Sequence, residues 1–171
     1  YSSTYTYNWA PVGFNFGVDF GNKFGLQLEA IKSAQGQIYD VINTANRIQG
    51  ANKFLNTRIL LSEEVVHGLD EFVTRPLGNF LLPGKTMPVH LVELLSARSL
   101  ANQEQLWLCG IFAESLRAYH SQHWDEARHG FNKILGIFPA DGPSRFFLSL
   151  CERYRNIQPI SPWPICRIET K

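Results

Sequence analysis

Three polar side chains, Asp40, Asn43 and Arg47, have the types and spacing of a nucleotide-binding set. Asn43 and Arg47 are four residues apart, so a helix would place both on one face, one turn apart. An amide and a guanidinium in this arrangement could orient a ribose and neutralise a phosphate. Asp40 could accept a hydrogen bond from an exocyclic amine, or it could simply cap the helix. The alternative interpretation of the whole stretch is an ordinary capped amphipathic helix.

The elements that would position these side chains are predicted from hydrophobic periodicity. Residues 12–24 alternate apolar with small or polar side chains, which predicts a half-buried strand. A short helix is predicted over residues 26–37, and the helix with the three polar residues over 40–54. The remaining elements of this half are a strand over 58–61, a helix over 63–69 capped by Ser62, and strands over 72–82 and 87–94 joined by a Gly-Lys turn.

After about residue 96 the apolar period becomes helical. Helices are predicted over residues 103–121, 125–137 and 143–154. The order of aromatic and small residues in the first two looks like one tetratricopeptide-type hairpin. A single hairpin of this kind cannot bury both of its faces, so we expect it to pack against other parts of the chain or a partner. The three prolines of residues 159–164 predict an extended tail, which Trp163 would anchor.

Several motifs occur in the order of a known family. Residues 40–49 read Asp-Val-Ile-Asn-Thr-Ala-Asn-Arg-Ile-Gln, and residues 57–66 read Thr-Arg-Ile-Leu-Leu-Ser-Glu-Glu-Val-Val. Residues 76–80 and 82–89 follow as Pro-Leu-Gly-Asn-Phe and Leu-Pro-Gly-Lys-Thr-Met-Pro-Val. This series resembles the C-terminal part of the class III adenylate and guanylate cyclase homology domain. The helical region after it is similar to the extension of cyanobacterial-type cyclases.

The resemblance implies an α+β fold with four segments. These are an aromatic arm over residues 1–11, a truncated cyclase-like domain over 12–95, a tetratricopeptide-like extension over 96–158 and a proline-rich tail over 159–171. The cyclase-like domain is expected to hold a partial, mainly antiparallel sheet with packed helices. The extension is expected to be a small all-α helical hairpin.

The resemblance also implies where catalysis would come from. Class III cyclases hold two divalent metals on carboxylates that, by this alignment, would precede residue 12, and residues 1–11 contain no Asp or Glu. We therefore expect a non-catalytic domain without cofactors, in which Asn43 and Arg47 are vestigial and any retained nucleotide binding uses Asp40 as well. The alternative is a half-site or fragment of an active cyclase, in which Mg²⁺ or Mn²⁺ is held elsewhere, for instance by the other subunit of a dimer.

The expected partners are other protein subunits. A sheet without its opening strands has an edge and a face that another chain would have to cover. Aromatic residues in an uncharged arm would gain from covering a partner surface. The candidate interaction residues are Tyr5, Tyr7, Trp9, Trp124 and Trp163.

Composition narrows the classes of partner and site. A formal net charge of +1 gives no field to recruit nucleic acid or an anionic membrane. No apolar run is long enough to span a bilayer. His120 and His123 are three residues apart but have no third ligand nearby in sequence, which predicts a solvated pair and no metal site.

The cysteines indicate the expected compartment. Cys109, Cys151 and Cys166 are an odd set without metal-ligand spacing. We interpret them as buried or free thiols of a reducing intracellular compartment, cytoplasmic or organellar after removal of a targeting peptide.

Overall fold

The computed structural model describes residues 5–9, 14–19, 25–30, 35–157 and 164–168, with side chains described from Asn43 onward. The chain divides into two compact units, Tyr1–Arg47 and Ile48–Lys171. Each unit is described by itself. The predicted domain boundary at residue 95 lies within the second unit. That residues 12–95 and 96–158 are separate domains stays a prediction.

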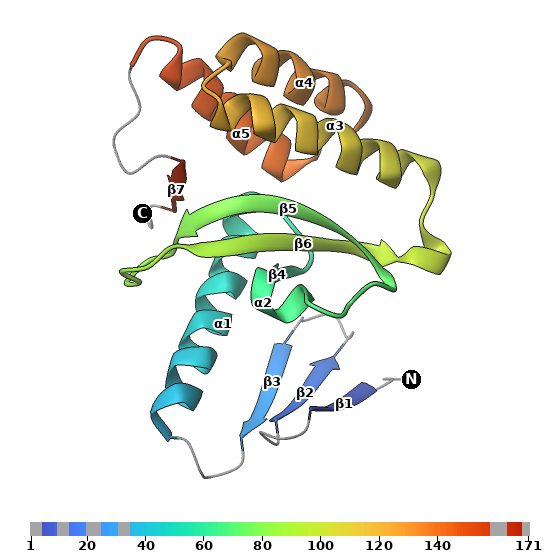
Figure 1. The fold of residues 1–171 in the computed structure, drawn as a ribbon, viewed down its shortest axis with the longest axis vertical. Coiled ribbons are helices and arrows are strands. Elements are labelled where there is room, and N and C mark those ends of the chain that lie inside the picture. The colour runs from blue at the N-terminus through green and yellow to red at the C-terminus, as the bar shows by residue number, and fades with distance from the viewer. Residues whose placement is uncertain (1–4, 10–13, 20–24, 31–34, 158–163, 169–171) are drawn as a thin grey trace. The chain divides into compact units, whose positions relative to one another are not determined.

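The first unit contains a three-stranded antiparallel sheet. Its strands are β1 (Tyr5–Trp9), β2 (Phe14–Asp19) and β3 (Gly25–Ala30), in the order β1-β2-β3 (Figure 1). The aromatic arm is therefore an edge strand in register with β2. The short helix predicted over 26–37 is wrong at its start, because leucine and alanine alternate with polar residues through β3 and the strand pairs with β2.

Helix α1 (Gln35–Leu55) begins five residues before Asp40. Asp40 is therefore inside the helix, and the interpretation of this residue as the cap is wrong. No proline interrupts residues 35–39, so the helix can extend backwards. Its last turns belong to the second unit, where Ile48, Ala51 and Leu55 are buried. Their spacing of three and four residues makes one apolar stripe.

The second unit is built on a four-stranded sheet. Strands β4 (Leu60–Ser62), β5 (Phe72–Leu81), β6 (Val89–Ala97) and β7 (Ile165–Arg167) are ordered β4-β6-β5-β7. The α+β class is confirmed. The sheet is mixed and not purely antiparallel, because β7, which the sequence did not indicate, runs parallel to β5.

Helix α2 (Glu63–Val66) follows β4 directly and is shorter than predicted. Ser62 occupies its N-cap position, but the side chain makes no capping hydrogen bond. The predicted strand pair after α2 is confirmed in β5 and β6, which form a long antiparallel hairpin with an irregularity between Pro76 and Gly78. Gly78 has a φ of 96°, a conformation that glycine adopts without steric cost.

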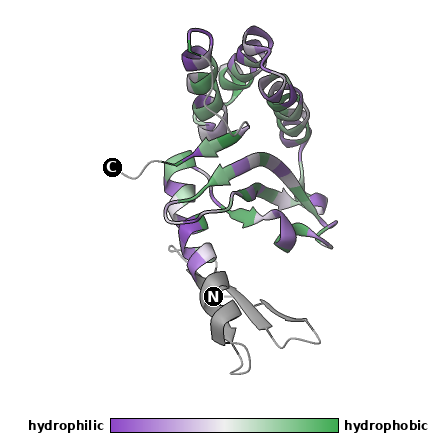
Figure 2. Ribbon diagram, turned by 60° about the vertical axis from the view of Figure 1, so that its left-hand side comes forward, coloured by the Kyte–Doolittle hydropathy of each residue, from purple (hydrophilic) through white to green (hydrophobic). Residues whose placement is uncertain are grey.

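Three helices form a layer along one side of the four-stranded sheet (Figure 1). After the short 3₁₀ turn η1 (Arg98–Leu100), they are α3 (Gln103–His120), α4 (Trp124–Ile137) and α5 (Gly142–Tyr154). Each predicted bound lies within one residue of the observed one. Asn102 and Gln105 form a capping box at the start of α3, which fixes where this helix begins. Figure 2 shows that these helices have hydrophobic and hydrophilic sides, as a layer packed on one side requires.

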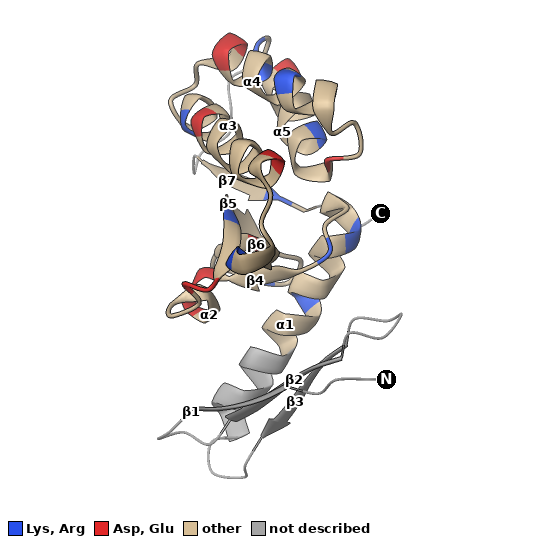
Figure 3. Cartoon of the chain, turned by 90° about the vertical axis from the view of Figure 1, so that its right-hand side faces the viewer, with Lys and Arg blue, Asp and Glu red and all other residues tan. Residues whose placement is uncertain are grey.

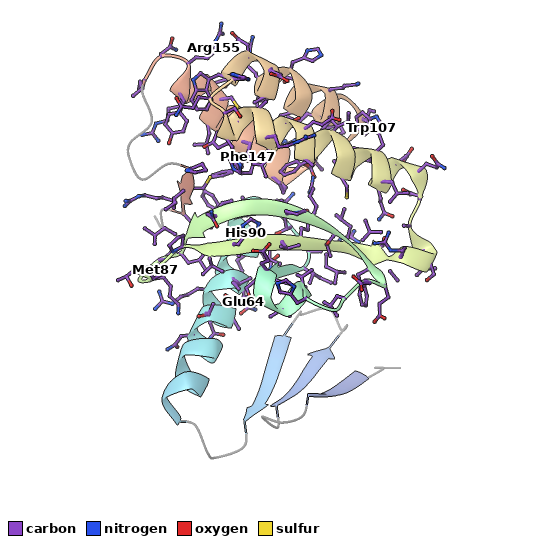
Figure 4. All side chains as sticks on the ribbon, viewed as in Figure 1. Glu64, Met87, His90, Trp107, Phe147 and Arg155 are labelled. Carbon is purple, nitrogen blue, oxygen red and sulfur yellow. The ribbon has the colours of Figure 1, made fainter. Side chains whose placement is uncertain are left out.

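An aromatic cluster fills the space between this layer and the sheet. Phe147 of α5 is fully buried and lies between helices and strands in Figure 4. Its ring centroid is 5.0 Å from that of Tyr119, 5.6 Å from that of Phe131 and 5.9 Å from that of Phe112. It also contacts Phe80 of β5 at 6.3 Å. The helices and the sheet therefore share one hydrophobic core.

Helix α5 approaches the end of α1 so closely that only glycine fits at its first position. A Cβ on Gly142 would lie 1.7 Å from the carbonyl oxygen of Leu55, a backbone atom that no side-chain rotation can move. We expect Gly142→Ala to lower the free energy of unfolding by about 1–3 kcal/mol. The measurement is urea unfolding followed by circular dichroism.

Gly110 in the exposed face of α3 is the matched control for this substitution. A Cβ there meets nothing within 4 Å, so Gly110→Ala is expected to stabilise the chain through helix propensity. Equal effects of the two substitutions would contradict the close contact between Gly142 and Leu55.

The cysteine prediction is confirmed for the thiols themselves. Cys109, Cys151 and Cys166 are all free, the latter two buried and Cys109 half-buried. Burial raises the pKa of Cys151 and of Cys166 to about 12, so both are held as thiols. Among the helices that the structure describes, none has the length and hydrophobicity needed to cross a membrane.

Candidate functional site

Asn43 and Arg47 lie one turn apart in α1, as their spacing predicts. The side chain of Asn43 is exposed and that of Arg47 is half-exposed. Neither has a hydrogen-bond or ion-pair partner among the residues that the structure describes. The side chain of Asp40 lies outside the described part, so its predicted contact with a nucleotide base stays a prediction.

A second group of charged side chains, which the sequence analysis missed, lies buried in the second unit. Arg75 of β5, Glu93 of β6 and Asp141 at the start of α5 form what we call the buried triad. Arg75 is 1% exposed. Its Nε and Nη2 donate to one oxygen of Glu93, the former at 3.0 Å. Its Nη1 and Nη2 donate to the two oxygens of Asp141 at 3.1 and 2.8 Å.

The triad joins the sheet to the helical layer. Asp141 is also the N-cap of α5 and accepts from the Ser144 amide at 3.0 Å. The guanidinium carbon of Arg75 lies 4.6 Å from the ring centroid of Phe112 in α3, a cation–π distance. One side chain of β5 thus contacts a neighbouring strand and two helices. A sequence signal existed: Arg75 lies between Val73 and Leu77, in the first part of β5, where odd positions are buried.

The two carboxylates of the triad have pKa values shifted in opposite directions. Burial raises the pKa of Glu93, and the attraction of Arg75 does not fully offset it. Burial also acts to raise the pKa of Asp141. The two hydrogen bonds from Arg75, the positive charge of Arg75 and the hydrogen bond from Ser144 outweigh burial and hold this pKa below its ordinary value. The difference follows from geometry, since Asp141 uses both oxygens and caps a helix, whereas Glu93 accepts on one oxygen.

These shifts give the stability of the chain two opposite dependences on pH. The pKa of Glu93 lies above its ordinary value of 4.5, so folding stability is expected to rise as the pH falls through the folded pKa toward 4.5. The pKa of Asp141 lies below its ordinary value of 3.8, so its contribution is lost as the pH falls below 3.8. Glu93→Gln is expected to remove the first dependence only. Urea midpoints measured from pH 3 to pH 8 test this.

The exposed Glu152→Gln is the control for the pH experiment, because it removes a carboxylate that is not buried. Its midpoints should follow those of the unmodified chain. If Glu93→Gln also leaves the pH profile unchanged, Glu93 is not the group that titrates above pH 4.5.

A groove adjoins the triad between α3 and β5. It has a volume of about 210 Å³ and is lined mainly by apolar surface, from Pro76, Phe112, Ala113 and Leu116. The basic residues Arg75, Arg117 and His120 complete the lining. The volume is below the range typical of small-molecule pockets, and it suits a single side chain better than a cofactor.

The beginning of α3 and the end of α4 carry exposed apolar side chains. Leu106 is 49% exposed and Ile137 is 54% exposed. Between them the half-buried rings of Trp107 and Phe138 lie 6.4 Å apart, which places the two helix ends side by side. Figure 4 shows Trp107 at this end of α3. We call these four residues the apolar end of the hairpin.

The remaining predicted residues have different environments. Trp124 is half-buried and its ring lies 5.6 Å from that of Tyr119 and 5.7 Å from that of Tyr154, so it contributes to the packing of α3 on α4 and α5. Whether it also contacts a partner stays a prediction. Trp163 and the side chains of Tyr5, Tyr7 and Trp9 lie outside the described part.

The two histidines differ from the predicted solvated pair. His123 is exposed and lies 3.5 Å from Glu126. His120 is half-buried at the end of α3, and burial together with the nearby His90 lowers its pKa. In residues 43–157 and 164–168, His, Cys, Asp and Glu side chains do not converge in threes on a possible metal position.

Comparison with protein-family models, curated proteins and solved structures found no significant similarity for this chain. Its function is therefore inferred from its residues and their contacts.

Proposed function

We propose that the chain is a non-catalytic domain, derived from the class III nucleotide cyclases, that serves as a structural or interaction subunit of a larger protein assembly. The order of elements supports the derivation: a helix with Asn43 and Arg47, a short buried strand, and a hairpin closed by the Gly-Lys turn. The buried triad supports a structural role. Arg75 is paired with both carboxylates, which holds α5 to the sheet, so its guanidinium is not available to a substrate.

The apolar end of the hairpin is the observation that carries the interaction role. Leu106 and Ile137 each leave about half of their surface in water, next to two aromatic rings. Exposed apolar clusters of this kind mark protein interfaces. Helical hairpins of repeat type bury such ends against a neighbour. The proposed partner is thus a protein with an apolar surface, which this end of the helical layer contacts.

The test isolates the tagged chain from its source cells and measures complexes by native mass spectrometry. The unmodified chain is expected in a stoichiometric complex, which Leu106→Glu combined with Ile137→Glu dissociates. Ile157→Glu, at another exposed apolar side chain, is the matched control and should retain the complex. A complex that survives the double substitution would show that another surface binds the partner. Formation of a cyclic nucleotide from ATP or GTP by the purified chain with Mg²⁺ or Mn²⁺ would contradict the non-catalytic assignment.

One observation favours a second candidate, a cyclase half-site. Asn43 and Arg47 have no partner among the described residues, so their donors are available to a ribose and a phosphate. In this candidate the metal ligands come from another subunit. Mixing with a metal-bearing cyclase subunit would then produce activity, and Arg47→Ala would lower it by about 100-fold or more. If Arg47→Ala leaves the activity of the mixture unchanged, this candidate is excluded.

A further inference from the structure

The groove between α3 and β5 favours an acidic occupant. No carboxylate lines it, and its three ionisable residues are all basic. The charge of Arg75 is neutralised within the buried triad. Burial and the neighbouring His90 of β6 lower the pKa of His120, which is therefore mostly neutral at neutral pH. Arg117 is exposed and has no ion pair with any described residue, so its charge is available to a ligand.

Helix α2 carries the complementary chemistry on the other side of the sheet. Glu63 and Glu64 are exposed, and neither has an ion-pair partner in the described part of the chain. The adjacent Val65 leaves 45% of its surface in water. Figure 3 shows the acidic residues of α2 away from the helical layer, and Figure 4 labels Glu64 there. This turn thus presents an apolar side chain beside two carboxylates.

We propose that α2 of one copy of this chain binds in the groove of a second copy. Val65 would enter the apolar part of the groove, against Phe112 and Leu116, and Glu64 would pair with Arg117 at the rim. The volume of the groove is suited to one aliphatic side chain, and the charges at its rim are opposite to those of α2.

The contact is heterologous, because it joins two different surfaces of the chain. Helix α2 lies on the opposite side of the sheet from α3, which lines the groove (Figure 1). Each copy bound through its α2 leaves its own groove open, so copies add head to tail and the assembly grows with concentration. This goes beyond the proposed function, because it involves neither the apolar end of the hairpin nor Asn43 and Arg47. The exposed ion pair also makes the association sensitive to salt.

Charge reversal tests the contact in sedimentation experiments on the full chain. The mean mass is expected to rise with concentration at low salt, and Arg117→Glu or Glu64→Arg should each weaken the association by about tenfold or more. In an equimolar mixture of the two variants, opposite charges face each other again at both kinds of contact: the unmodified α2 of the first variant meets the unmodified groove of the second, and the reversed α2 meets the reversed groove. The mixture should therefore associate head to tail again, with the two variants in alternation.

Matched controls have the same change in charge outside the contact. Arg58→Glu and Glu152→Arg alter exposed residues that do not line the groove or belong to α2, and should associate as the unmodified chain does. If a charge reversal disturbs the circular dichroism spectrum, Arg117→Gln and Glu64→Gln replace it. The proposal is overturned if the chain stays monomeric at its highest soluble concentration in low salt. It is equally overturned if the variants associate normally or if their mixture associates no more strongly than either variant alone. The double substitution at Leu106 and Ile137 should not affect this association, so the two proposals fail independently.

Discussion

Replacement of Arg75 by methionine is expected to lower the free energy of unfolding by about 3–5 kcal/mol. The substitution removes the cation from both carboxylates. Glu93, which is 7% exposed, loses its partner, and Asp141 keeps only its capping contact with Ser144. Methionine keeps most of the side-chain volume beside Phe112, so the lost unfolding free energy comes mainly from removal of the positive charge. Urea unfolding at neutral pH measures it.

A neutral triad separates the effect of charge from that of packing. Combining Arg75→Met with Glu93→Gln and Asp141→Asn should recover most of the lost stability, because no unpaired charge remains and asparagine still caps α5. Arg58→Met changes an exposed arginine and should leave the midpoint unchanged. A loss below about 1 kcal/mol for Arg75→Met would mean that the carboxylates are neutral in the folded chain.

Truncation of Phe147 to alanine is expected to cost about 3–5 kcal/mol of unfolding free energy. This ring is 1% exposed and contacts aromatic rings from α3, α4 and β5. Its removal leaves a cavity that the surrounding rigid rings cannot close. Thermal and urea unfolding should both show the loss as one cooperative transition of the sheet and the helices, since they share this core.

The control for Phe147 is Ile157→Ala, which shortens a side chain that is 58% exposed and should have little effect. Two separate transitions in the Phe147→Ala variant, one for strands and one for helices, would contradict a shared core.

Hydrophobic periodicity was sufficient to predict the three helices α3, α4 and α5. The bounds of α3, α4 and α5 follow from apolar stripes and from Asn102, Asp141 and the residues after them, which are local start signals. Hydrophobic periodicity failed where pairing with another strand determines the secondary structure. The leucines of β3 suit a helix or a strand, and pairing with β2 selects the strand. Strand β7 has three residues, too few for periodicity to identify, and forms only because β5 offers an edge.

The candidate site was predictable only in part. The spacing of Asn43 and Arg47 is a local property of α1, so sequence places them on one face. The buried triad joins residues 75, 93 and 141, which lie far apart in sequence, and only the packing of α5 on the sheet brings them together. A charged residue at an inward position of β5 indicates that a partner is needed, but not which residue it is.

The link between β6 and α3 has a consequence for protease resistance. Residues 98–100 and 102–104 of this connection are exposed, yet the segments on either side of it are held together by the buried triad and the aromatic cluster. A protease that cuts this connection would therefore produce a nicked molecule that elutes as a single species under native conditions. Its two fragments would separate only in denaturant, and limited digestion followed by gel filtration would underestimate how many bonds have been cleaved.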